Sequence, residues 1–245
     1  MNEFWFYIVI LLSHIIQGIT GFAGTLLAMP FSLMLVGSAV AVPVLNGLGL
    51  LSGAYVYLGN KRDVVRKELL TVLAVMIPGM LLGIWLRGLL ASRGNALFIT
   101  LGAIVLVIAA RGLYDIFVRK GNGMPTSRFP AVRWAMLILA GIVHGMFVCG
   151  GPLLIGYLAE RFDDKAQFRA TLGTSWLFLN GLLLITQIIA GDWNGELLRM
   201  MLIAAPVLFA SMFIGGRLYK HMSQRFFMIL TYVLLVISGV TLFFK

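Results

Sequence analysis

The longest uncharged stretch of the sequence decides what environment the chain can occupy. From Phe4 to Asn60 there is no Lys, Arg, Asp or Glu. A helix of about 20 apolar residues is enough to cross a bilayer. Hydrophobic residues make up 60% of the 245 and charged residues 11%, whereas soluble domains carry roughly 25% charged residues. We therefore predict an all-α integral membrane protein with the lipid bilayer as its surroundings.

Short charged clusters divide the chain into apolar runs, which set the predicted helices. The runs cover residues 4–36, 38–59, 69–86, 96–113, 134–159, 170–190, 198–216 and 226–244. The net charge of +10 fits the basic loops that orient membrane proteins. It does not require a nucleic-acid partner, and we predict none.

A sequence theme of the first half returns in the second half. GITGFAGTLL at Gly18–Leu27 matches GMFVCGGPLL at Gly145–Leu154 at an offset of 127 residues, and Pro78 matches Pro206 at 128. A nearly constant offset indicates a duplication. We predict two homologous transmembrane repeats, residues 1–118 and 133–245, joined by a polar cytoplasmic linker at 119–132.

The distribution of Lys and Arg distinguishes two topologies. If every run spans the membrane, the two sides carry 11 and 8 Lys and Arg residues. If runs 4–36 and 134–159 are re-entrant hairpins that return to the side they came from, the sides carry 15 and 4. Cytoplasmic loops are enriched in Lys and Arg, so the second topology is favoured.

The predicted fold therefore has two inverted repeats. Each repeat is a re-entrant broken-helix hairpin followed by three transmembrane helices, an arrangement common among secondary transporters. Both termini of this multi-pass protein would be non-cytoplasmic. A plain eight-helix transmembrane bundle is the alternative.

The hairpins predict where a ligand would bind. We expect the helices to break at Gly21–Thr25 and at Cys149–Pro152, with new half-helices beginning at Thr25 and Pro152. The first turn of a helix has unpaired N–H groups and a positive dipole end, which together favour an anion. We expect the two breaks to meet near the membrane centre and to hold a small oxyanion.

Two groups of residues are candidates for this site. The expected substrate-binding residues are Thr20, Gly21, Gly24, Thr25, Cys149, Gly150, Gly151, Pro152 and Arg169. The residues expected to line a cavity or to take part in coupling are Gln17, Asn46, His144, Thr174, Ser175 and Asn180.

Structural roles for the same residues stay open at this point. The glycines could serve close helix packing. Arg169 could pair with Asp163 or Asp164, or extend to the interface. A buried histidine is often simply hydrogen-bonded to a neighbouring helix.

Catalysis is not expected. The sequence has no HExxH motif, no paired carboxylates within an apolar run and no Ser–His pair at a recognisable spacing. We predict no catalytic residues, no metal site and no cofactor, and we keep an intramembrane enzyme as an unlikely alternative.

The sequence contains the two glycine motifs, the FRATLGTSW stretch at Phe168–Trp176 and the LYKHMSQRFFMIL stretch after Pro206. These features together resemble the TauE/SafE sulfite-exporter-like permeases, the TSUP family. The resemblance covers nearly the whole chain. It implies transport, usually export, of small sulfur oxyanions or organosulfonates, such as sulfite, thiosulfate or sulfoacetate, across the bacterial inner membrane. An anion channel, or a transporter of another small carboxylate or inorganic anion, is the alternative.

The family pattern has a glycine-rich GxGGG-type motif in each half. Here the first copy is GFAGT and the second is VCGGP, so both have lost glycines. The first half also lacks an arginine that matches Arg169. These departures leave the substrate within the class open.

Overall fold

The computed structural model describes residues 2–90, 94–118, 130–148, 150–159, 161–162 and 164–241, and these contain ten helices and no strand. The chain divides into two compact units. Unit 1 contains Met1–Leu69 and Arg169–Met222, and unit 2 contains Leu70–Phe168 and Ser223–Lys245. Each unit therefore draws on both halves of the sequence.

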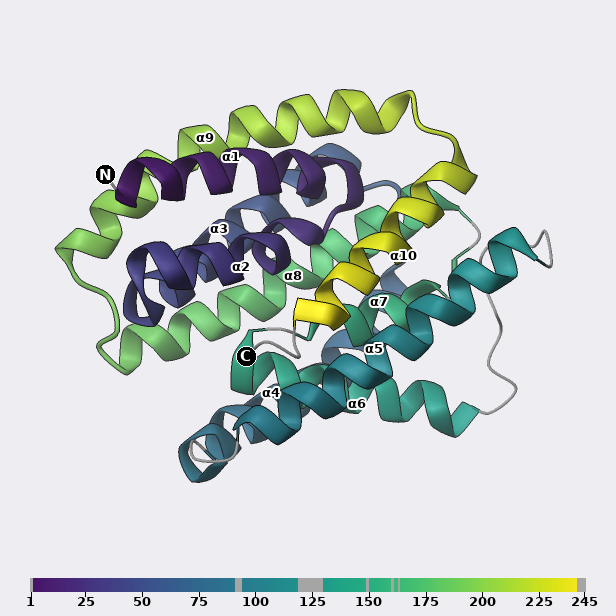
Figure 1. The fold of residues 1–245 in the computed structure, drawn as a ribbon, viewed down its shortest axis with the longest axis horizontal. Coiled ribbons are helices and arrows are strands. Elements are labelled where there is room, and N and C mark those ends of the chain that lie inside the picture. Colours follow the sequence, from purple (N-terminus) through teal and green to yellow (C-terminus); the bar gives the residue numbers. More distant parts are fainter. Residues whose placement is uncertain are drawn as a thin grey trace. The chain divides into compact units, whose positions relative to one another are not determined.

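Unit 1 is built around a helical hairpin. Its helices are α1 (Asn2–Thr20), α2 (Ala23–Val36), α3 (Ser38–Asn60), most of α8 (Lys165–Ile189) and α9 (Gly195–Lys220). After α1 the chain reverses, and α2 returns beside it (Figure 1). Helix α9 packs along both α1 and α3.

Unit 2 contains the second broken helix. Its helices are most of α4 (Arg66–Leu90), α5 (Gly94–Phe117), α6 (Pro130–Phe147), α7 (Gly151–Ala159) and α10 (Gln224–Thr241). Helix α10 packs on α5, α6 packs on α7, and the short α7 also touches α5 and α10.

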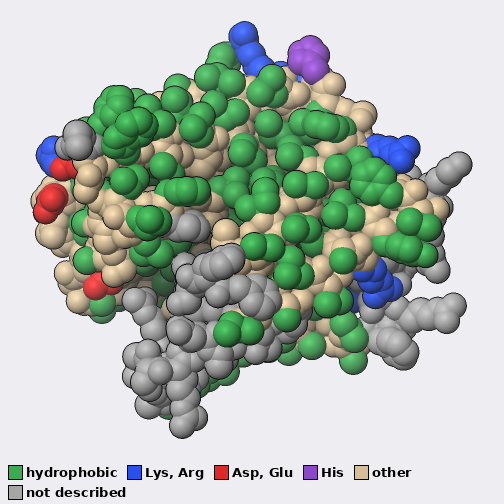
Figure 2. Space-filling view, viewed as in Figure 1, with side chains coloured by type: hydrophobic (Ala, Val, Ile, Leu, Met, Phe, Trp, Pro, Cys, Tyr) green, Lys and Arg blue, Asp and Glu red, His purple; other side chains and the backbone are tan. Residues whose placement is uncertain are grey.

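The helices have the length and composition of membrane spans. Six of them, in the described part of the chain, are long and apolar enough to cross a bilayer: Asn2–Thr20, Ser38–Asn60, Arg66–Leu86, Lys165–Ile189, Gly195–Lys220 and Gln224–Thr241. Large apolar side chains such as Trp85, Met34 and Ile189 face outward, and hydrophobic side chains cover much of the face in Figure 2. The prediction of an all-helical membrane protein is confirmed.

The repeat-equivalent helices α3 and α8 run antiparallel inside unit 1. Near the start of α3, the Asn46 amide donates to the Asn180 carbonyl (3.2 Å) and to the Gln187 side chain (3.0 Å). Near its end, the Gly53 backbone lies against Gly173, where an added Cβ would meet the carbonyl oxygen at 2.9 Å. Residue 180 stands 127 positions after residue 53, and residue 173 stands 127 positions after residue 46. The repeat offset therefore relates the contact 53–173 to the contact 46–180.

A second pair of contacts is related by offsets of 127 and 128 residues. In unit 1, a Cβ added to Gly18 on α1 would lie 2.8 Å from the Met212 carbonyl oxygen on α9. In unit 2, a Cβ added to Gly145 on α6 would meet the Met80 carbonyl oxygen on α4 and would lie 2.9 Å from the Ile84 backbone nitrogen. The two halves thus use equivalent positions for close packing.

Both observations agree with an inverted repeat, which stays a prediction, as do the boundaries at 118 and 133. Residues 119–129 of the predicted linker lie outside the described residues.

Candidate functional site

The first predicted break is confirmed and is made by a left-handed glycine. Helix α1 ends at Thr20, and Gly21 has φ +86°, a conformation that a side chain disfavours. The Gly21 N–H closes the last turn by donating to the Gln17 carbonyl at 2.7 Å. Helix α2 then begins at Ala23, two residues before the predicted Thr25.

The second break has the same backbone signature. Helix α6 ends at Phe147, and Val148, which stands 127 residues after Gly21, has φ +57°. Its N–H donates to the His144 carbonyl at 2.8 Å. A β-branched residue in this region is strained, a state often retained at functional sites. Helix α7 begins at Gly151, one residue before the predicted Pro152, and Cys149 lies outside the described residues.

The start of α2 is occupied by side chains of α1. The Thr20 hydroxyl accepts from the Ala23 N–H at 3.3 Å, and the Gln17 Oε1 accepts from the Thr25 N–H at 3.3 Å. The sequence predicts first-turn donors that are free for an anion, but the Ala23 and Thr25 N–H groups are paired within the protein. Phe22 is the N-cap residue of α2, and its side chain makes no capping hydrogen bond.

Gln17 also ties the break to α3. Its amide nitrogen donates to the Ser52 hydroxyl, which in turn donates to the Gly49 carbonyl at 2.9 Å. A Cβ on Gly24 would collide with the Gln17 Oε1, so Gly24 makes room for this amide. A ligand that bound the Thr25 N–H would compete with the Gln17 Oε1 for this donor.

Arg169 reaches the same break from α8. Its side chain is only 4% exposed, and its Nη2 donates to the Gly18 carbonyl at 2.7 Å. That carbonyl is in the last turn of α1, where the helix dipole is negative. Gly21 lies beside the Arg169 side chain, because an added Cβ would meet the Arg169 Cγ at 3.1 Å.

Arg169 has no carboxylate partner among the described residues. Asp164, one of its predicted partners, instead caps α8 by accepting from the Ala166 and Gln167 N–H groups, and Asp163 is outside the described residues. The guanidinium stacks 4.6 Å from the centre of the Tyr219 ring, a favourable cation–π geometry. Its buried Nε has no hydrogen-bond partner in the described structure.

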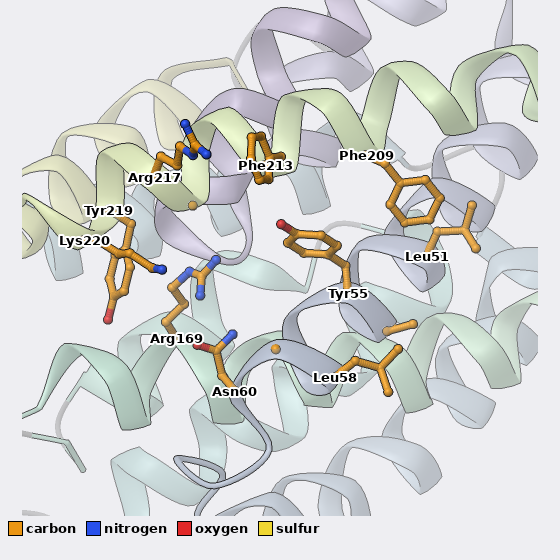
Figure 3. Close-up of a pocket in the computed structure, with 13 residues that line it drawn as sticks. Leu51, Tyr55, Leu58, Asn60, Arg169, Phe209, Phe213, Arg217, Tyr219 and Lys220 are labelled. Carbon is orange, nitrogen blue, oxygen red and sulfur yellow. The ribbon is translucent and has the colours of Figure 1, made fainter.

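A pocket of about 600 Å³ opens beside Arg169 within unit 1 (Figure 3). The last turns of α3 and of α9 form its walls. Figure 3 shows the Arg169 guanidinium, the Lys220 amine and the Tyr55 hydroxyl directed toward the same region. The lining residues are Leu51, Ala54, Tyr55, Leu58, Gly59, Asn60, Arg169, Phe209, Phe213, Gly216, Arg217, Tyr219 and Lys220.

The remaining polar candidates in unit 1 have structural hydrogen bonds. The hydroxyls of Thr174 and Ser175 donate to the carbonyls of Ala170 and Thr171 one turn earlier. Asn46 and Asn180 join α3 to α8. None of these four lines the pocket.

The candidates around the second break lie in unit 2. His144 is buried on α6, and Gly150 packs against it, since an added Cβ would meet the His144 Cβ at 2.7 Å. Gly151 and Pro152 form the first turn of α7. That these residues meet the first break stays a prediction.

Sequence reasoning missed most of the pocket. Arg217 and Lys220 are in the final turns of α9, where basic residues are usually assigned to anchoring. Tyr55 and Asn60 have no distinguishing pattern. One sequence signal pointed to these residues: the predicted hairpin topology puts the ends of both helices on the side with the larger count of Lys and Arg.

A family model described as sulfite exporter TauE/SafE matches residues 6–242. A protein of Comamonas testosteroni named "Probable inner membrane transporter protein TsaS" is 28% identical over 184 residues, which cover 75% of this chain and 74% of that protein. No solved structure matches.

Proposed function

The chain belongs to the sulfite exporter TauE/SafE family and is a membrane transporter. From this premise we propose that it carries small sulfur-containing oxyanions, such as sulfite, thiosulfate or organosulfonates, across the bacterial inner membrane. We propose export as the direction of transport.

The observation that carries this proposal is Arg169, a buried guanidinium without a described carboxylate partner. Charged groups inside membrane proteins are costly and usually functional. A guanidinium pairs well with oxyanions because its planar donors match two oxygens at once. The unpaired Nε supplies a donor for such a ligand.

The broken hairpin beside Arg169 supports the same substrate class. The Gln17 Oε1 holds a position at the start of α2 that an anion oxygen could take. We propose that the substrate exchanges with this amide oxygen while Arg169 holds its charge.

Alternating access is the proposed mechanism. The antiparallel pairing of α3 with α8 and the offset-related contacts support two inverted halves that rock about the bound anion. In this mechanism the anion is bound at the membrane midplane between the two broken-helix N-termini and is exposed first to one side and then to the other.

Thermal unfolding of the purified protein with sulfite, thiosulfate, sulfoacetate and chloride tests the substrate class. A ligand at about 100 times its Kd stabilises the folded state by about 2.7 kcal/mol. We expect one or more sulfur oxyanions to raise Tm and chloride to leave it unchanged. Equal behaviour of all four anions would contradict the proposal.

A further inference from the structure

The pocket beside Arg169 is placed where three helix ends come together. Its lining includes Asn60, the last residue of α3, and Lys220, the last residue of α9, while Arg169 lies in the second turn of α8. In the predicted hairpin topology, the adjoining loops belong to the side of the protein with the larger count of Lys and Arg. By the positive-inside rule this is the cytoplasmic side.

Among the described residues, the charged side chains that line the pocket are all positive. Arg169, Arg217 and Lys220 line it, and none of the acidic residues that the structure describes does. Neither Arg217 nor Lys220 has an ion pair with a described residue. Arg217 lies 4.5 Å over the Phe213 ring. Positive groups along low-dielectric walls concentrate anions locally.

The size and the exposure of the pocket indicate a place where an anion enters the protein. A site that closely encloses a small anion would be smaller. About 600 Å³ has room for roughly twenty waters at about 30 Å³ each, so a small oxyanion could enter with much of its hydration. Exposure then falls along the pocket, from the exposed Arg217 and Lys220 to the buried Arg169.

We propose that this pocket is a cytoplasmic loading vestibule for small oxyanions. Arg217 and Lys220 attract the hydrated anion, and the anion passes to Arg169 at the α1–α2 break. This inference rests on the proposed function, because the proposed function supplies the identity of the transported anion. A lipid phosphate headgroup offers the same oxyanion chemistry, so the test separates the two sources.

The test compares two charge-matched double variants in sulfite counterflow. Arg217→Gln with Lys220→Gln removes two pocket charges, and Lys61→Gln with Arg62→Gln removes two exposed charges that follow α3 and do not line the pocket. In phosphatidylcholine vesicles at low salt, we expect the pocket variant to raise KM about tenfold with kcat nearly unchanged. High salt should shrink this difference, and the control should keep the wild-type KM.

The outcomes distinguish this inference from the proposed function. An unchanged KM in the pocket variant, or an equal rise in the control, overturns the vestibule while transport stands. If the wild-type protein transports no sulfur oxyanion, calorimetric titration with sulfite tests the vestibule instead. Loss of sulfite binding in the pocket variant, with binding kept in the wild type and in the control variant, supports the vestibule. Absence of binding to wild-type protein overturns it.

A lipid arm repeats the KM measurement with phosphatidylglycerol added to the vesicles. We expect the pocket variant to keep its KM defect in both lipids. A defect that appears only with the anionic lipid assigns the pocket to a headgroup and overturns the vestibule.

Discussion

Single residues of α1 and α8 join the helix break to the helices around it. Arg169 binds the Gly18 carbonyl, and Gln17 bonds both to the Thr25 N–H and to Ser52 on α3. These contacts satisfy buried backbone groups that a broken helix would otherwise leave unpaired. When these side chains move, the Thr25 N–H and the Arg169 guanidinium become available as donors, which is why we connect them with anion binding.

Gln17 and Gly24 should be energetically coupled. Gly24→Ala places a Cβ against the Gln17 amide and should lower the unfolding free energy by about 1–3 kcal/mol through lost hydrogen bonds. In a Gln17→Ala background, the same substitution should cost about 1 kcal/mol less. Unfolding of the four proteins in detergent measures the coupling.

The control for this cycle is Gly59→Ala, at a glycine with no atom near its added Cβ. Its effect should add to that of Gln17→Ala. Additive costs for Gln17→Ala and Gly24→Ala would show that the amide does not occupy the space beside Gly24.

Part of the site was predictable at this scale. Glycine and threonine near residue 21, and glycine and proline near 151, weaken helices for local reasons, so both breaks were found within a few residues. The partners of Arg169 were not predictable, because the Gly18 carbonyl lies 151 positions away in sequence. Thr174 and Ser175 were expected to line a cavity, yet their hydroxyls bond to their own helix.

Among the helices, the α3–α8 pair depends on the absence of side chains. The Gly53 backbone approaches Leu177 and Gly173 so closely that an added Cβ would lie 2.6 Å from the Leu177 nitrogen. Backbone atoms of a helix cannot move aside as a flexible side chain can. The contact fixes the crossing point of the two repeat-equivalent helices.

A matched pair of substitutions on α3 tests this packing. Gly53→Ala should destabilise the protein by about 1–3 kcal/mol through overpacking. Gly59→Ala, on the same helix and with open space around it, should be neutral or stabilise by roughly 0.5–1 kcal/mol. Thermal or denaturant unfolding provides the measurement, and equal effects at both positions would exclude close approach of α8 at Gly53.

For the whole molecule, sequence and structure give complementary information. Apolar runs and charge clusters predicted most helices, because a membrane imposes length and composition on each span. The grouping of α1, α2 and α3 with α8 and α9 in one unit was beyond the sequence, since apolar helices carry few signals that specify their partners.

Labelling of single cysteines tests the topology. In a Cys149→Ser background, Arg62→Cys and Asp192→Cys should react with a membrane-impermeant thiol reagent from opposite sides. The hairpin topology puts these loops on different faces, whereas the plain eight-helix bundle puts both on one face. Labelling of both from the same side would contradict the inverted repeat.

The central claim is that Arg169 holds the transported sulfur oxyanion, and sulfite counterflow in proteoliposomes tests it most directly. Lysine retains the charge of residue 169 but lacks the planar fork of donors. We predict that wild-type protein exchanges sulfite in a saturable way that chloride does not inhibit. Arg169→Lys should be at least about tenfold slower while unfolding near the wild-type temperature. Wild-type rates in a folded Arg169→Lys protein would contradict the account.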